Sequence, residues 1–390
     1  MSRRRRTLAA AVLAAVTLTG CGLTASGETD DSQVSTDGAD PAGEVSFSTD
    51  GWKTDFSEHS VPLTEFRSGG PPRDGIPPLD NPSFVSQERA AQDLDPSEPV
   101  AVVEIGDEAR AYPIRILTWH EIVNDELGGT PISVTFCPLC NSTVAFDRRV
   151  GGRTMTFGTT GNLRRSDLVM WDRQTESWWQ QITAEAVVGE LTGTKLEVLA
   201  SQILSFTDFR KAHPEGEVLS QDTGFDRSYG ENPYAGYDTN EGLVTGDTPD
   251  RTLPAKARVS AVKDLAERPI VYPFARLRDD APVNDRAGGT DLVVFYDSKV
   301  RSALDETSIP ESRNVGASAV YRRRLGERTL TFTQGSAPGR FNDRQTGSEW
   351  DLTGRAIRGE LKGRQLEAIP HDDQFWFALA AFFDDPDIRR

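Results

Sequence analysis

Two cysteines separated by two residues form the group in this chain with the clearest capacity for chemistry. They stand in the stretch Cys137-Pro138-Leu139-Cys140, and the whole sequence holds one further cysteine, Cys21. A Cys-x-x-Cys pair can close a disulfide across a short loop, and a disulfide of this kind exchanges readily with other thiols. The same two thiolates can bind a soft or borderline metal ion. The pair therefore indicates redox or metal chemistry.

Three functions fit the pair. The first is a thiol–disulfide redox couple without a bound cofactor, in which one cysteine attacks, the other resolves, and a nearby His120 stabilises the thiolate or moves its proton. The second is a non-enzymatic copper or zinc site made of Cys137, Cys140 and His120, because a closed zinc site needs four ligands and the sequence has no second Cys pair. The third is a structural disulfide in a binding or scaffold protein, although so short a loop stabilises little.

A repeat at an offset of 160 residues supplies an internal control for these candidates. Between residues 112–136 and 272–296, ten of twenty-five positions are identical, and further matches follow after an insertion in the second copy. Two homologous units are therefore predicted, at 98–220 and 256–388, with a connector at 221–255.

The two units differ at the residues that could do chemistry. Residues that only build a scaffold should persist in both copies, whereas a site that is needed once can be lost from one of them. All three candidates are replaced in the second unit, His120 by Asp280, Cys137 by Asp297 and Cys140 by Val300. Cys137, Cys140 and His120 are therefore the predicted catalytic residues, and the second unit is predicted to be a scaffold or docking surface.

The hydrophobic pattern of each unit has mainly the period of β-strands. Residues 100–105 and 109–114 flank Gly106-Asp107, a turn signal that predicts a hairpin. Helices are predicted at 118–127, from the capping pattern of Thr118 and Glu121, and at 205–213. The fold class predicted is β-rich α+β, with two tandem homologous, mostly antiparallel β domains and short helices.

The first twenty residues are typical of an export signal. Four arginines begin at Arg3, a short uncharged run follows, and Leu-Thr-Gly before Cys21 resembles the lipobox of bacterial lipoproteins. The run is too short to span a bilayer. This predicts a signal peptide at 1–20, lipidation of Cys21 and anchorage to the outer face of the plasma membrane. A flexible tether at 21–50 and a Pro/Gly-rich segment at 51–97 would follow.

The charge of the chain restricts its partners. The formal net charge is −17, and removal of the arginine-rich signal makes it more negative. Such a surface repels phosphate backbones, so nucleic acid is excluded as a partner. The expected partners are the membrane, through the lipid on Cys21, and an exported protein that carries a disulfide or a metal.

Four ordered motifs together resemble the DUF3179 family of bacterial and archaeal proteins. They read DGIPPLD from Asp74, WHEIVND from Trp119, TFCPLC from Thr135 and NPYAGYD from Asn232. The resemblance places the Cys pair in the family's central motif. Because some members carry selenocysteine in this pair, it implies redox chemistry and favours a thiol–disulfide oxidoreductase. Asn141 stands where a small residue such as Gly is expected, which puts the turn after the pair in question.

The lipid anchor is the first prediction to test. Cys21→Ser should move most of the protein from the membrane fraction to the soluble fraction, because the tether has no apolar face of its own to hold it there. Fractionation of cells that express the full chain, followed by a salt wash, measures this. A variant that stays in the washed membranes would contradict lipidation at Cys21.

Overall fold

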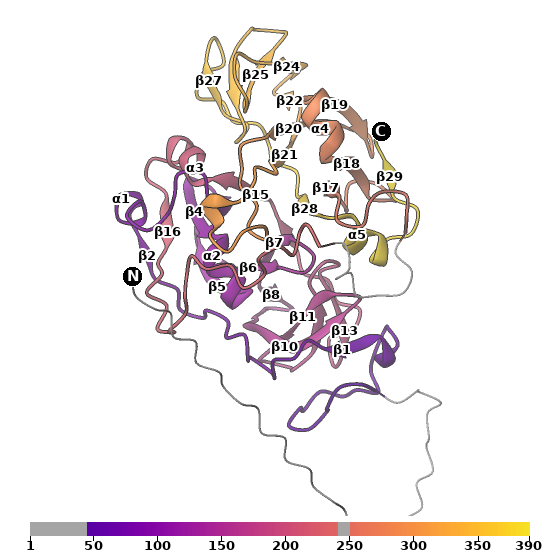
Figure 1. Ribbon diagram of the computed structural model, residues 1–390. Coiled ribbons are helices and arrows are strands. Elements are labelled where there is room, and N and C mark those ends of the chain that lie inside the picture. Colours follow the sequence, from indigo (N-terminus) through magenta and orange to yellow (C-terminus); the bar gives the residue numbers. More distant parts are fainter. Residues whose placement is uncertain (1–44, 241–249) are drawn as a thin grey trace, which may run out of the picture. The chain divides into compact units, whose positions relative to one another are not determined.

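The structure is a computed structural model that describes residues 45–240 and 250–390 (Figure 1). The predicted signal peptide at 1–20, Cys21 and most of the predicted tether lie outside the described residues. The described chain forms mostly antiparallel sheets joined by short helices, so the predicted β-rich α+β class is confirmed. Across 45–240 and 250–390, none of the helices has the length and apolar character needed to cross a membrane.

The first unit opens with the predicted hairpin of β3 (Pro99–Ile105) and β4 (Glu108–Pro113), joined through Gly106 at a φ of +63°. These strands belong to a sheet of order β15-β3-β4-β16-β2, in which β16 runs parallel to β4. The other elements of this layer are β2 (Phe84–Val85), α1 (Gln87–Ala90), β15 (Ser201–Ser205), α3 (Phe206–Ala212) and β16 (Glu217–Leu219). The helix predicted at 205–213 is confirmed, because the Ser205 hydroxyl caps α3 by accepting the Asp208 N–H at 3.0 Å.

The helix predicted at 118–127 is wrong. The observed helix α2 (Ile114–His120) overlaps the predicted range only at residues 118–120, and β5 (Ile122–Leu127) occupies most of the rest. Glu121 ends the helix with a φ of +57°, and its carbonyl accepts the Phe136 N–H at 2.8 Å. The pairing of β5 with β6 (Thr130–Cys137) therefore overrides the capping pattern, since the tertiary contact outweighs local preference.

Two more layers complete the first unit. The sheet of order β14-β7-β6-β5 carries the cysteines and includes β7 (Ser142–Asp147) and β14 (Val198–Leu199). The sheet of order β1-β10-β11-β12-β13 contains β1 (Phe66–Ser68), β10 (Phe157–Arg164), β11 (Asp167–Asp172), β12 (Trp178–Gln180) and β13 (Glu185–Val188). The short elements η1 (Leu63–Glu65), β8 (Arg149–Val150) and β9 (Arg153–Thr154) lie at their edges. Phe47, from the range predicted as tether, packs 5.1 Å from the Trp178 ring, so ordered structure begins before residue 50.

Most elements of the second unit follow the order of the first, although within the described residues β14 has no counterpart and η3 is added. Its sheet β28-β17-β18-β29 matches β15-β3-β4-β16, including the parallel last pair. Its elements are β17 (Arg258–Val262), β18 (Ile270–Pro273), α4 (Phe274–Asp280), β19 (Val283–Ala287), β20 (Thr290–Asp297), η3 (Ile309–Glu311), β21 (Ala317–Arg322), β22 (Arg324–Leu325), β23 (Arg328–Thr329), β24 (Phe332–Gln334), β25 (Arg340–Asp343), β26 (Glu349–Asp351), β27 (Ala356–Arg358), β28 (Asp372–Phe375), α5 (Trp376–Phe382) and β29 (Asp387–Ile388). Common descent of the two units stays a prediction from the sequence.

Equivalent side chains make equivalent contacts in the two units. The Tyr112 hydroxyl donates to Asp125 at 2.7 Å, and the Tyr272 hydroxyl donates to Asp285 at 2.8 Å. The Asn124 and Asn284 amides each donate to a backbone carbonyl at 2.8 Å. In the first unit these contacts join β4 to β5 and β5 to β10, and in the second they join β18 to β19 and β19 to β24, so each contact connects two sheets.

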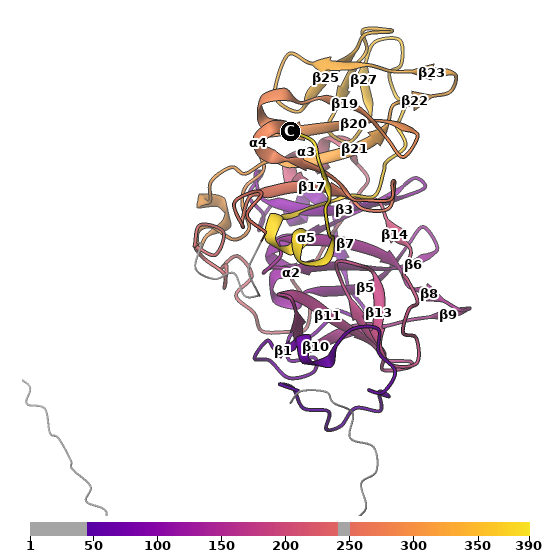
Figure 2. The ribbon, with the colours of Figure 1, turned by 90° about the vertical axis from the view of Figure 1, so that its right-hand side faces the viewer.

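The second unit packs directly behind the cysteines of the first. Strand β28 lies beside β7 (Figure 1). In the turned view, most of the second unit lies above the first (Figure 2). Phe375, at the end of β28, donates its N–H to the Cys140 carbonyl at 2.9 Å. The hydrophobic core around the Cys pair therefore contains side chains of both units.

Candidate functional site

The Cys pair occupies the turn between two central strands. Strand β6 ends at Cys137, which pairs with Ser142 at the start of β7, and four residues form the turn between them. The Asn141 N–H donates to the Pro138 carbonyl at 3.3 Å, and Asn141 takes a φ of +52°. Asparagine tolerates this left-handed conformation better than most residues. The departure from the family pattern at Asn141 is therefore compatible with the turn. Both cysteines are free thiols in the structure.

Asp167 is the third member of the site, and sequence reasoning missed it. The sulfur atoms of Cys137 and Cys140 and a carboxylate oxygen of Asp167 all lie within 4.8 Å of one another. Asp167 begins β11 directly after the two-residue turn Arg165-Ser166, whose φ angles are +50° and +68°. This turn also brings the Ser166 carbonyl to 3.4 Å from the Cys140 sulfur.

The two oxygen atoms of the Asp167 carboxylate have different surroundings. Oδ2 accepts the Ile182 N–H at 3.0 Å and the Gln180 side-chain amide at 2.5 Å. Oδ1 is buried without an N–H or O–H donor in the described chain, and the Cys140 thiol lies within hydrogen-bonding reach of the carboxylate. Burial raises the pKa of Asp167 to about 6, against the lowering effect of its hydrogen bonds. At neutral pH it is therefore an ionised base beside a thiol.

Glu121 places a second carboxyl group at the site. It is buried at the end of α2 and close enough to Asp167 and Cys137 for their charges to interact. Burial raises the pKa of Glu121 to about 8, and the negative charge of Asp167 adds to the rise. At neutral pH Glu121 therefore holds its proton while Asp167 has lost one. Two carboxyl groups whose pKa values are pushed apart in this way are typical of an acid and a base.

The comparison of the two units also indicates that both carboxyl groups belong to the site. Glu121 is replaced by Ala281 in the second unit. When Asp172 is aligned with Asp343, the position of Asp167 holds Pro338. Both acids are thus lost from the second unit together with the cysteines, and the comparison that selected the cysteines could have selected them.

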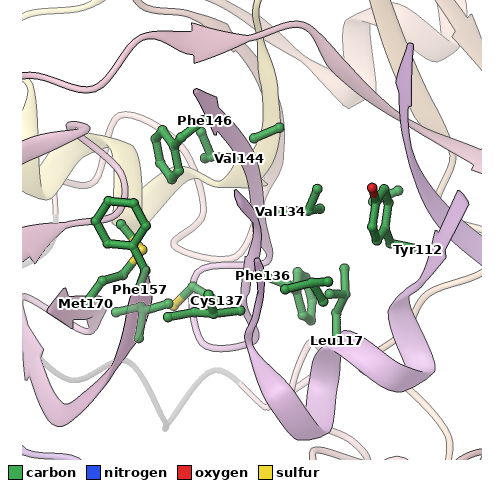
Figure 3. Close-up of a cluster of buried hydrophobic side chains, with 14 of the residues drawn as sticks. Tyr112, Leu117, Val134, Phe136, Cys137, Val144, Phe146, Phe157 and Met170 are labelled. Atoms are coloured by element: carbon green, nitrogen blue, oxygen red, sulfur yellow. The ribbon is translucent and has the colours of Figure 1, made fainter. Parts of the chain in front are cut away.

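The two thiols are not equivalent. Burial raises the pKa of both, and the Cys140 thiol donates to Cys137, which lowers the pKa of Cys137 and raises that of Cys140. The exposed fraction is 2% for Cys137 and 0% for Cys140. Figure 3 shows Cys137 at the end of its strand, close to Phe157 and Met170 of the neighbouring layer. Cys137 is therefore the thiol that ionises first.

The structure does not bring His120 to the thiols. Its Nδ1 lies 2.7 Å from the Pro77 carbonyl oxygen, and its Nε2 lies 2.5 Å from the Tyr229 hydroxyl. Tyr229 in turn is 2.5 Å from the Thr223 hydroxyl. Burial lowers the pKa of His120, so the ring is neutral at pH 7. The contacts of His120 hold the connector against the segment before β2.

The connector covers the Cys pair. The Tyr237 hydroxyl donates to the Leu139 carbonyl, inside the turn, at 3.0 Å. The next residue, Asp238, is anchored by Arg258 at 3.2 Å and by Arg313 at 3.0 Å. Arg313 belongs to the insertion of the second unit. The covering segment is thus fixed by charges on the second unit.

Comparison with known proteins identifies the family. The chain belongs to the family described as protein of unknown function (DUF3179), whose model matches residues 73–386. The match includes both units, the Cys pair and both buried carboxyl groups. No curated protein and no solved structure matches the chain.

Glu121 generates a prediction about stability and pH. Its pKa is raised from 4.5 to about 8 in the folded chain, so between these values the unfolded chain has released a proton that the folded chain keeps. Stability therefore falls as pH rises through this window, by up to on the order of 5 kcal/mol. Glu121→Gln cannot ionise and should gain stability over the wild type at pH 8 but not at pH 4.

Denaturant unfolding of the full chain at both pH values measures the effect. Glu126→Gln, at the exposed position of the strand β5 that follows Glu121, is the matched control and should show no gain that depends on pH. An equal change for Glu121→Gln at pH 4 and pH 8 would contradict the protonation state assigned to Glu121.

Proposed function

We propose that this DUF3179 protein is an extracytoplasmic, membrane-anchored thiol–disulfide redox protein, in which Cys137 and Cys140 cycle between dithiol and disulfide. The observation that carries the proposal is the Asp167 carboxylate, which is buried beside the two sulfurs with one oxygen lacking an N–H or O–H donor. Burying a carboxylate is costly, and a pair that only filled space would not need one. The selenocysteine found at this pair in some members of the family supports the same chemistry.

The dithiol reduces the disulfide of a partner in two steps. The Cys137 thiolate, having released its proton to solvent, bonds to one partner sulfur and breaks the partner's S–S bond. The departing sulfur takes the proton of Glu121, which solvent then replaces. Cys140 gives its proton to Asp167 and attacks the Cys137 sulfur, and the second partner sulfur leaves with that proton. Two electrons and two protons pass to the partner, which becomes two thiols.

The covering connector controls access to the pair. Because Cys137 is 2% exposed, a partner's disulfide reaches it only after Tyr237 moves away from the turn. Opening of this contact is therefore part of the reaction.

A second candidate function rests on the same geometry. Three possible ligand atoms, two sulfurs and one carboxylate oxygen, lie within 4.8 Å of one another. Thiolates favour copper and zinc, so the reduced pair could hold either ion. The third ligand would be Asp167 and not His120, because the contacts of His120 lie elsewhere. The protein would then be a metal-binding lipoprotein without catalysis.

Single cysteine variants separate the two functions. Cys140→Ser should trap a disulfide partner on Cys137, whereas Cys137→Ser should trap little, since Cys140 is fully buried and has the higher pKa. Asp167→Asn should slow the resolving step by roughly 10²-fold or more, the usual contribution of a general base, and so accumulate mixed disulfide. Acid quenching, alkylation and mass spectrometry of the full chain count these species. Asp147→Asn, at the far end of β7, is the matched control.

Metal content is measured on the same proteins. Stoichiometric copper or zinc in the reduced wild type, lost in Asp167→Asn and with no trapped partner in Cys140→Ser, would assign the site to metal binding. Equal trapping by both cysteine variants would contradict the order of attack.

The cover generates a separate prediction. Tyr237→Phe removes only the hydrogen bond to the Leu139 carbonyl, worth about 0.5–1.5 kcal/mol, so alkylation of the reduced pair should speed up by roughly 2- to 10-fold. Stopped alkylation followed by mass spectrometry gives the rate. Tyr321→Phe removes a hydrogen bond of the same kind to Leu352 in the second unit and should leave the rate unchanged. An unchanged rate in Tyr237→Phe would show that this contact does not limit access.

A further inference from the structure

A buried lysine of the second unit, Lys263, is connected to Asp167 through one residue of the first unit. Lys263 directly follows β17, and its side chain is 8% exposed. Its ammonium group donates to the Ile182 carbonyl at 2.7 Å. The N–H of the same Ile182 donates to Asp167 at 3.0 Å. The peptide groups of Ile182 therefore link the two side chains, because its carbonyl accepts from Lys263 and its N–H donates to Asp167.

Asp372 connects this lysine to the cysteine turn. Its Oδ1 lies 3.3 Å from the Lys263 ammonium nitrogen, and its Oδ2 accepts the Ser142 hydroxyl at 3.3 Å. Ser142 pairs with Cys137 across the turn. The ion pair of Lys263 and Asp372 therefore reaches both the strand end that carries the thiols and the residue that binds Asp167.

The ion pair is absent from the equivalent place in the first unit. In the strand registers, Val262 of β17 corresponds to Val103 of β3, so Lys263 takes the position of Glu104. By the same registers Asp372 takes the position of Gln202. A glutamate and a glutamine cannot form an ion pair, so this pair is no part of the scaffold that the two units share. The ion pair occurs in the second unit, whose strand β28 lies beside β7, the strand that follows the cysteine turn.

We propose that Lys263 and Asp372 are positioning residues for the redox couple. They fix Asp167, through Ile182, and the cysteine turn, through Ser142, relative to each other, so that the Asp167 carboxylate stays within reach of the Cys140 thiol. The inference rests on the proposed function, and it makes the second unit a necessary part of the site rather than a scaffold.

The test follows the reaction of the reduced full chain with oxidised glutathione at one fixed pH and counts the mixed disulfide and the internal disulfide separately. Lys263→Gln should leave the rate of the first attack by Cys137 unchanged and slow the resolving attack by Cys140 by roughly 10-fold or more, because the base for that step is no longer held in place. Lys263→Arg should restore the wild-type rate of the resolving step. Asp372→Asn should slow the same step, because it releases both the Lys263 ammonium and the Ser142 hydroxyl.

Controls separate this inference from the proposed function. Arg323→Gln removes another cation of the second unit that donates to a backbone carbonyl, at 2.9 Å, and should leave the resolving rate unchanged. A wild-type chain that forms no disulfide would overturn the proposed function. A wild-type chain that reacts, with an unchanged resolving rate in Lys263→Gln, overturns the positioning role alone. If Lys263→Gln does not fold, Asp372→Asn decides, and a wild-type resolving rate in that variant overturns the inference.

Discussion

The Asp167 carboxylate, held ionised beside two buried thiols, is the constraint on which the rest of the site depends. A buried charge is stable only where hydrogen bonds and an opposite charge compensate for the loss of water. Ile182 and Gln180 supply the hydrogen bonds, and Lys263 supplies the opposite charge. Because Lys263 belongs to the second unit, one of the interactions that lower the pKa of this buried base comes from outside the first unit.

Four of the eight non-glycine residues with a positive φ in the described chain lie in or next to the site. Glu121, Asn141, Arg165 and Ser166 all have φ angles between +50° and +68°, and each lies in or next to the site. Residues other than glycine hold such angles only where the surrounding structure fixes them, and such positions are common at functional sites. Here the strands on either side of each turn fix the backbone. The strained turns bring a carboxyl group, a carbonyl and the cysteine loop to one point, which unstrained hairpins would not do.

The sequence could predict the parts of the fold that local chemistry decides. The hairpin through Gly106 and the helix capped by Ser205 follow from their own residues. The helix predicted at 118–127 was wrong because the end of α2 depends on pairing with β6, which no local pattern reveals. His120 was grouped with the cysteines because all three are lost from the second unit, yet its two ring nitrogens contact Pro77 and Tyr229 of the connector instead of the thiols. Asp167 was missed because the repeat was compared only at residues already suspected.

The equilibrium reduction potential of the Cys137–Cys140 pair decides whether the pair cycles between dithiol and disulfide. The full chain would be equilibrated with glutathione buffers and with dithiothreitol buffers, and the fraction of dithiol would be counted by alkylation and mass spectrometry. A redox couple predicts a reversible two-electron transition with a potential above roughly −300 mV, the limit below which inert structural disulfides lie. A potential below that limit, or a pair that forms no disulfide in any buffer, would show that Cys137 and Cys140 are not a redox couple.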